Sequence, residues 1–268
     1  MPNLKKIDTG TDQLLCEISK QVGIITLNQP RKRNALGDIL TPALRNILQV
    51  LENDTNVNVI IITGAGKAFC SGGDISTMGL SENKKKTKDE QISDLIKKQN
   101  DLTLRLFNLK KPTIAMIPGA TAGAGLCIAL ACDLRIASYN AVFTTGFGNV
   151  GLPGDYGGTW FLPKVVGLDL AKRLFFTAEI IDSKKALEIG IITELTKENE
   201  LSTFTFELAK KIASAPPNAI QAMKKNLNNS ISFNLKQGLR AEAEDTIEAI
   251  SGDEHRLAVK EFLNRKRK

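Results

Sequence analysis

The chain has 268 residues and a formal net charge of +7, with 42% hydrophobic and 24% charged residues. This composition is typical of a globular protein with a large core and excludes a collagen-like or disordered chain. The last four residues, Arg265 to Lys268, carry four of the positive charges. The excess is therefore largely a tail, and it does not by itself indicate a basic face for binding nucleic acid.

Histidine and cysteine usage excludes two kinds of catalytic or metal site. The single histidine, His255, lies among charged residues near the C-terminus, so we expect it on the surface. The chain therefore lacks the histidines that a multi-histidine metal site needs, and a histidine-based catalytic triad is not expected. No CxxC pair occurs among the four cysteines, which we expect to be small buried hydrophobes in a reducing, cytoplasmic environment. Residues 1–8 contain no apolar signal-peptide core.

The first two thirds of the chain predict strands that alternate with helices. Two apolar runs, 14–19 and 22–27, predict a hairpin. Leucine and isoleucine recur at helical spacing over 40–51, and Asp38 is the expected N-cap of that helix. The β-branched run 57–63 predicts a central parallel strand, and the runs 113–117 and 134–137 resemble it. This alternation indicates an α/β core.

Two stretches need separate interpretation. Residues 112–132 carry no charge and are long enough to span a bilayer. Pro118-Gly119 interrupts them and small residues follow, so we predict a strand, a turn and a buried helix, and no membrane contact. The charged stretch 81–90 predicts a solvated, mobile loop.

The C-terminal part of the chain predicts helices alone. Beyond about residue 170 the strand signal fades, and helical patterns cover 201–212, 219–227 and 241–250, with a break at Pro216-Pro217. We therefore predict an α/β core over residues 1–195 and a helical region over residues 196–268.

A first glycine-rich segment, residues 63–74, follows a predicted strand. It fits neither nucleotide-phosphate pattern, because Ala68 follows Lys67 and the glycine spacing differs. Its Ser71-Gly72-Gly73 sequence exposes backbone N–H groups that a ligand can approach closely. An ordinary tight turn is an equally good interpretation of this segment alone.

A second glycine-rich segment, residues 118–133, begins a helix that is apolar on every side. The first turn of this helix is Gly123-Ala124-Gly125, and its free N–H groups would lie inside the protein. A buried helix N-terminus without a capping side chain attracts a negative or polarised oxygen from a ligand. Capping by Thr121 is the alternative.

A third glycine-rich segment, residues 148–160, contains Asp155, which is the one carboxylate between Tyr139 and Leu168. Taken alone, Asp155 fits the N-cap of the following helix as well as it fits a catalytic base.

Taken together, four motifs resemble the crotonase superfamily, the enoyl-CoA hydratases and isomerases. They are Asn28–Leu36, Gly64–Asp74, the helix start that ends in Ala131–Ala137, and Gly151–Thr159. The similarity runs in order along nearly the whole chain. It implies a spiral of ββα units with a helical C-terminal region that forms homotrimers, often paired into hexamers. It also implies an acyl-CoA thioester substrate, with coenzyme A carried by the substrate and no separate cofactor.

The resemblance also implies where this substrate binds. Two backbone N–H groups, which fall here at Gly73 and Ala124, would polarise the thioester carbonyl and stabilise an enolate. The segment 76–99 would wall part of the acyl pocket. The positions expected to contact the substrate are Arg33, Ala35, Leu36, Ser71, Gly72, Gly73, Asp74, Ile75, Gly123, Ala124 and Pro153.

Within the superfamily the reaction follows the acid/base residues. Hydratases similar to the mammalian mitochondrial enzyme use two glutamates, and the matching positions here are Cys127 and Phe147, which cannot activate water. Asp155 matches an aspartate of ring 1,2-epoxyphenylacetyl-CoA isomerase-type members. We therefore predict an enoyl-CoA isomerase in which Asp155 shuttles the proton.

Several alternatives stay open. One is a hydratase that uses Asp155 alone, and another is a different enolate reaction such as thioester hydrolysis. The chain could also be a non-catalytic acyl-CoA binder, or an RNA binder that uses the basic tail and the Lys84–Lys88 run.

Overall fold

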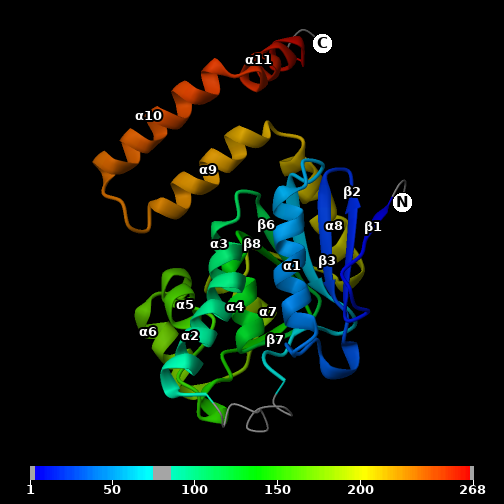
Figure 1. Cartoon of the computed structure of the whole chain (residues 1–268), viewed down its shortest axis with the longest axis vertical. Coiled ribbons are helices and arrows are strands. Elements are labelled where there is room, and N and C mark those ends of the chain that lie inside the picture. The colour runs from blue at the N-terminus through cyan, green and yellow to red at the C-terminus, as the bar shows by residue number, and fades with distance from the viewer. Residues whose placement is uncertain (1–3, 75–85, 266–268) are drawn as a thin grey trace.

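A central β-sheet organises the protein in this computed structural model, which describes residues 4–74 and 86–265 (Figure 1). Within these residues the large sheet has seven strands in the order β1-β2-β3-β4-β6-β8-β11. Their bounds are Lys5–Ile7, Leu14–Ser19, Val22–Leu27, Val59–Gly64, Thr113–Ile117, Leu134–Ser138 and Glu194–Thr196. A smaller sheet has the order β10-β9-β7-β5, with bounds Ile181–Asp182, Val142–Thr144, Ala120–Ala122 and Ala68–Cys70.

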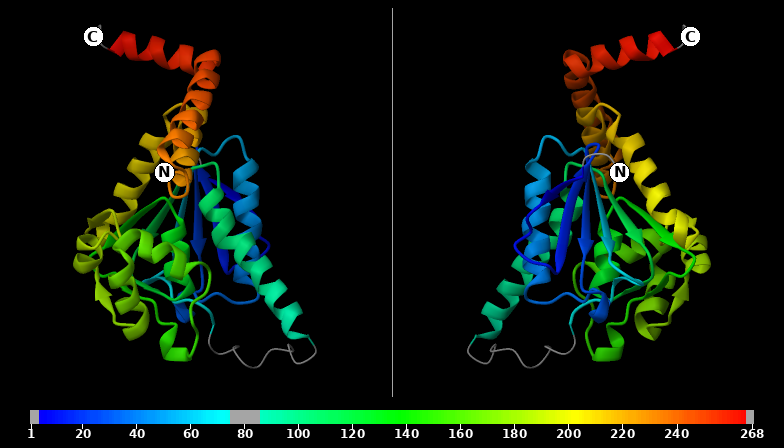
Figure 2. Two further views of the ribbon diagram at one scale, coloured as in Figure 1. Left: turned by 90° about the vertical axis from the view of Figure 1, so that its left-hand side faces the viewer. Right: turned by 90° about the vertical axis from the view of Figure 1, so that its right-hand side faces the viewer.

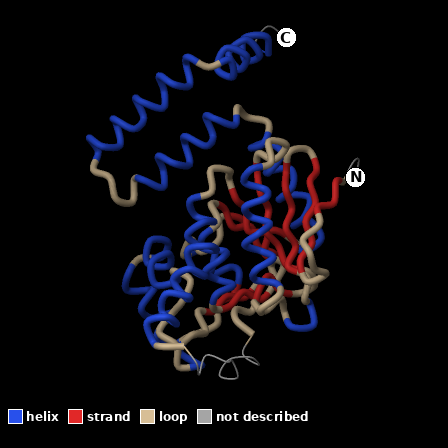
Figure 3. The backbone as a smooth tube through the Cα atoms, in the orientation of Figure 1, coloured by secondary structure: helices blue, strands red, loops and turns tan. Residues whose placement is uncertain are grey.

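Strand β4 shows why the large sheet is covered on both faces. Every residue of β4 is buried, and β4 pairs in parallel with β3 and β6. Successive side chains of a strand point to opposite faces. Accordingly Ile60 and Ile62 belong to the main core with helix α1 (Leu40–Asn53), whereas Val59 and Ile61 pack with α8 (Glu198–Ala213). Figure 3 shows the strands of the large sheet on the right, next to the N-terminus, and most of the helices to their left and above them.

The chain repeats one unit: a strand of the large sheet, a short strand of the small sheet, then helix. Strands β4 and β5 precede α2, a π-helix η4 and α3; β6 and β7 precede α4; and β8 and β9 precede η5, α5 and α6. The helix bounds are Lys88–Gln99 (α2), Asn100–Leu104 (η4), Arg105–Asn108 (α3), Ala124–Ala131 (α4), Gly148–Val150 (η5), Gly158–Val166 (α5), Leu168–Thr177 (α6) and Ser183–Glu188 (α7). A short 3-10 helix, η1 (Pro30–Lys32), lies between β3 and α1. The predicted α/β fold of ββα units is confirmed.

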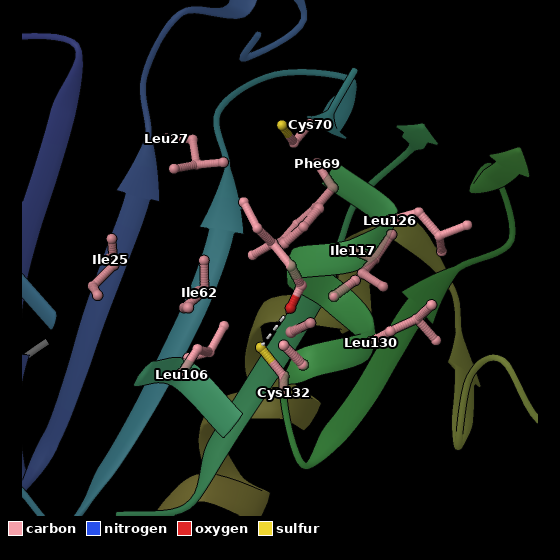
Figure 4. Packing of buried hydrophobic residues seen from close by; sticks show 14 of the residues in the cluster. Ile25, Leu27, Ile62, Phe69, Cys70, Leu106, Ile117, Leu126, Leu130 and Cys132 are labelled. Carbon is pink, nitrogen blue, oxygen red and sulfur yellow. Dashed lines mark hydrogen bonds between the residues drawn. The ribbon is translucent and has the colours of Figure 1, made fainter. Parts of the chain in front are cut away.

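Helix α4 is buried in the main core, against the small sheet and the helices α5 and η4. All of its residues are buried, and Figure 4 shows Leu126 and Leu130 of α4 near Ile117 of the large sheet. The uncharged stretch 112–132 therefore forms a strand and a buried helix as predicted, although its predicted turn also contains β7. In the described ranges, no helix is both long and apolar enough to cross a membrane.

Helices α9 (Pro217–Asn229), α10 (Leu235–Ser251) and α11 (Asp253–Arg265) extend away from the sheets (Figures 1 and 2). One buried ion pair holds α9 to the body: Lys224 Nζ lies 2.8 Å from Asp133 Oδ2 and also donates to the carbonyl oxygen of Lys111. The division of the chain after residue 195 stays a prediction. Helix α8, which lies beyond this boundary, packs directly on the large sheet.

Three local predictions need correction or completion. Asp38 does not cap α1, because the N-cap position is Ile39 and no side chain bonds there. Part of the predicted loop 81–90 is helical, since Thr87 caps α2 and Lys88 begins it. Residues 81–85 lie outside the described residues. The sequence did not predict strands β1, β5, β7, β9, β10 and β11.

Candidate active site

The backbone at Gly73 presents a free N–H group. An isolated parallel bridge joins Gly73 to Leu36, in which Leu36 N donates to Gly72 O (2.7 Å) and Asp74 N donates to Leu36 O (3.0 Å). This pairing leaves the N–H of Gly73 directed away from Leu36, and among the described residues it finds no acceptor. Gly72 has a φ of +92°, which favours glycine. A Cβ on Gly72 would also lie 3.4 Å from Ala124 N, so the two predicted donors are neighbours.

The N-terminus of α4 is buried and has no side-chain cap. Its N-cap residue, Gly123, has a φ of 53°, and the N–H of Ala124 has no acceptor within the described part of the chain. Capping by Thr121 is wrong, because the Thr121 hydroxyl donates to Gly119 O (3.1 Å) instead. The positive end of the helix dipole therefore points into the protein beside Gly72, where it can stabilise a negative oxygen.

Asn34 fixes the loop that leads to these donors. Its side chain is fully buried; Nδ2 donates to Ala68 O (2.8 Å) and to Ala65 O (3.0 Å), while Oδ1 accepts from Gln29 N (2.8 Å). One amide thus ties the segment after β4 to the segment before α1. The resemblance places Asn34 in a stretch expected along the CoA path, but its bonds to Ala65 and Ala68 could not be predicted, because these partners lie 31 and 34 positions away.

The Asp155 side chain is half-buried and is held by two donors at one oxygen. Oδ1 accepts hydrogen bonds from Tyr156 N (2.6 Å) and from Gln99 Nε2 (2.7 Å). Helix α5 begins at Gly158 with Gly157 as its N-cap, so the N-cap interpretation of Asp155 is wrong. Gln99 ends the segment 76–99 that was expected to wall the acyl pocket, but its hydrogen bond to Asp155 could not be predicted, because no local pattern links it to a partner 56 positions away.

The Cys127 and Phe147 side chains lie beside the segment that carries Asp155. The Cys127 thiol, one turn after Ala124 on α4, donates to the backbone oxygen of Asp155 (3.3 Å). Burial, and then the nearby charge of Asp155, raise the pKa of this thiol, which stays protonated. Phe147 stacks on Phe175 with ring centroids 6.2 Å apart. A Cβ on Gly158 would lie 2.8 Å from Cys127 Sγ and 3.8 Å from Phe147, so both side chains adjoin the segment that carries Asp155.

The other predicted substrate-binding residues differ in burial and in their contacts. Ala35 and Leu36 are buried, Ser71 N donates to Arg33 O (3.0 Å), and Pro153 is exposed. Asp74 forms an ion pair with Lys32 (2.7 Å). Ile75 lies outside the described residues.

A pocket of about 690 Å³ opens beside residues 66–68, in the segment 65–73 that leads to the Gly73 donor and is called the first donor loop below. Three cationic residues line it, and they are Arg31, Arg33 and Lys67. A larger pocket, of about 890 Å³, lies among α9, α10 and α11 and is lined in part by the exposed His255. None of the predicted site residues that the structure describes lines this larger pocket. No cluster of potential metal ligands occurs in residues 4–74 or 86–265.

Comparison with known proteins agrees with this geometry. The model of the family described as enoyl-CoA hydratase/isomerase matches residues 17–268. A short-chain-enoyl-CoA hydratase of Clostridium acetobutylicum is 32% identical over 257 residues, which cover 96% of each chain. The 1,2-epoxyphenylacetyl-CoA isomerase of Escherichia coli is 30% identical and covers 93% of this chain and 95% of its own.

The fold has solved counterparts as well. An enoyl-CoA hydratase structure from Bacillus anthracis superimposes with a TM-score of 0.87 at 30% identity, over 94% of this chain and 96% of that one. The sequence and the fold of this chain thus match those of one enzyme family over nearly their whole length. The uncapped N-terminus of α4 and the glycine loop at Gly72 lie within the matched residues. The protein belongs to the enoyl-CoA hydratase/isomerase family of the crotonase superfamily.

Proposed function

We propose that this protein moves the double bond of an enoyl-CoA thioester, with Asp155 as the proton shuttle. The observation that carries the proposal is that the Cys127 thiol and the Phe147 ring lie beside the segment that carries Asp155. The thiol donates to the backbone oxygen of Asp155, and both side chains adjoin Gly158. These two residues stand where the resemblance predicts the glutamates of hydratases. Neither can activate water, because the thiol is protonated and phenylalanine has no exchangeable proton.

The proposed reaction needs no second base. Asp155 removes a proton from C2 of a 3-enoyl-CoA, so the C2–H bond breaks and an O–H bond forms on the carboxyl group. Negative charge then develops on the thioester oxygen, where the N–H groups of Gly73 and Ala124 donate to it. The carboxyl group returns the same proton to C4, and the double bond moves into conjugation with the thioester. Preorganised donors of this kind each contribute about 10²–10³ in rate.

The charges near the first donor loop support a coenzyme A thioester as the substrate. Arg31, Arg33 and Lys67 line the 690 Å³ pocket, and cationic side chains favour the phosphate groups of coenzyme A. The absence of any separate cofactor, and a cytoplasmic location, stay predictions.

The C-terminal helices support the predicted assembly. Large apolar side chains on α10 and α11 are more than half exposed, and they are Leu235, Leu239, Ile247, Ile250, Leu257, Phe262 and Leu263. Burying such side chains against other copies would stabilise an oligomer. The homotrimer or hexamer stays a prediction.

The test compares the wild type with Asp155→Asn on 3-enoyl-CoA, by formation of the conjugated thioester, and on 2-enoyl-CoA, by its hydration. We expect isomerisation by the wild type and a loss of about 10²–10⁴-fold in Asp155→Asn. The matched control is Asp169→Asn, which changes an exposed carboxylate in the first turn of α6. Full turnover by Asp155→Asn would refute the assignment.

The same assay separates the alternatives. A hydratase with one carboxylate would show hydration that is faster than isomerisation and that depends on Asp155. The hydratase names of several relatives favour this alternative. Acyl-CoA binding without either reaction would identify a binding protein.

A further inference from the structure

Gln99 contacts the candidate base from a distant part of the chain. It is the last residue of α2 and is half-buried, and its Nε2 donates to Asp155 Oδ1 at 2.7 Å. The backbone N–H of Tyr156 donates to the same oxygen at 2.6 Å. Asp155 Oδ2 accepts no hydrogen bond from the described residues. The two oxygens of one carboxylate therefore have different surroundings.

We propose that Gln99 is a positioning residue, which holds Oδ1 so that Oδ2 is the oxygen that takes and returns the proton. This inference rests on the proposed isomerase function. A carboxylate oxygen offers two lone pairs in its plane, and the two N–H donors occupy both on Oδ1. A carboxylate held by Tyr156 alone could rotate, and a displacement of about 1 Å at a reacting group can lower a rate about 10²-fold.

The position of Gln99 in its helix suits this role. No residue of α2 is fully buried, so most of this helix lies on the surface of the protein. Directly after Gln99 the chain forms the π-helix η4, in which Leu102 and Thr103 are buried. Thr103 Oγ1 donates to Gln99 O (3.4 Å). Gln99 thus lies where an exposed helix enters the core, and π-helical turns are frequent at functional sites.

The first test replaces Gln99 with methionine, which keeps an unbranched side chain of similar length and removes the N–H donor. We expect kcat to fall roughly tenfold to a hundredfold, as for loss of a hydrogen bond to a charged group, with KM changed less than about twofold. The matched control is Gln91→Met on the same helix, where the exposed amide donates to Lys86 O (3.0 Å). Turnover by Gln99→Met equal to that of Gln91→Met would overturn the inference.

A second variant provides a readout that a purely structural role would not change. In Gln99→Glu two carboxyl groups are in contact, and both cannot be ionised without strong repulsion. A proton shared between them restores a donor to Oδ1. We therefore expect the rate of Gln99→Glu, relative to that of Gln99→Met, to rise as the pH falls from 8 to 6. A constant ratio would contradict the inference.

Asp155→Asn, measured alongside, separates the two proposals. Full turnover by Asp155→Asn would end the isomerase proposal, and the role of Gln99 with it. Loss of turnover in Asp155→Asn with normal turnover in Gln99→Met would overturn the role of Gln99 alone. Thermal unfolding of each variant shows that the fold is retained.

Discussion

Replacing Ala124 with proline would remove one candidate oxyanion donor with little damage to the fold. Ala124 is the first residue of α4, the helix position at which proline is favoured because its N–H has no partner within the helix. The residue before it, Gly123, has φ 53° and ψ −127°, so it lies outside the helical region that proline disfavours in its predecessor. The Ala124 N–H bonds to none of the described residues, so its loss breaks no hydrogen bond there.

We expect Ala124→Pro to lower kcat/KM for 3-enoyl-CoA by at least about 10²–10³, equivalent to about 2.7–4 kcal/mol of transition-state stabilisation. A ring carbon of the proline would also occupy the space where the thioester oxygen is expected, and this would lower kcat/KM further. The free energy of unfolding should change by less than about 1 kcal/mol. The assay follows formation of the conjugated thioester, and urea titration checks the fold.

The control places proline at the same position of another helix. Glu198 is the first residue of α8, and its carboxylate bonds to the exposed Asn140 side chain (2.7 Å), a contact of small energetic value. Glu198→Pro should keep wild-type turnover. A folded Ala124→Pro variant with turnover within tenfold of the wild type would show that the α4 N-terminus does not hold the oxyanion.

Three further predictions concern stability. A Cβ on Gly125 would lie 2.2 Å from the carbonyl oxygen of Cys70, so Gly125→Ala should lose about 3 kcal/mol in urea titration, and wild-type stability would contradict the packing. Lys224→Met breaks the ion pair with Asp133, which keeps its bonds to Thr113, and should cost about 2 kcal/mol in urea titration; wild-type stability would show that the pair contributes nothing. Burial raises the pKa of the Cys70 and Cys132 thiols from 9.0 to about 12, so they stay protonated in the fold and ionise earlier once unfolded. The free energy of unfolding should therefore be constant near pH 7, fall from about pH 9 upward, and fall less steeply in Cys132→Ala.

Most of the core could be predicted because its signals are local. Strand β4 is a β-branched run with both faces buried, and α4 is an apolar helix that begins at glycines. Strands β10 and β11 were missed because they have two and three residues, and pairing with neighbours, not composition, makes them strands.

Local sequence signals also separate the candidate site residues that could be predicted from those that could not. Gly73, Ala124 and Asp155 occur in motifs that can be recognised without coordinates. Asn34 and Gln99 act through hydrogen bonds to partners 31 and 56 positions away, and nothing in their own surroundings indicates those partners. Long-range contacts of single polar side chains depend on the assembled fold, so only a structure reveals them.

The bridge between Leu36 and Gly73 has a consequence for how this enzyme could change over evolutionary time. Leu36 and Asn34 hold the segment that leads to Gly73 through hydrogen bonds to Ala65, Ala68, Gly72 and Asp74. Insertions, deletions or substitutions beyond Asp74 would then leave these hydrogen bonds in place. Selection could alter the choice of acyl group in that stretch while the chemistry at the thioester stayed constant.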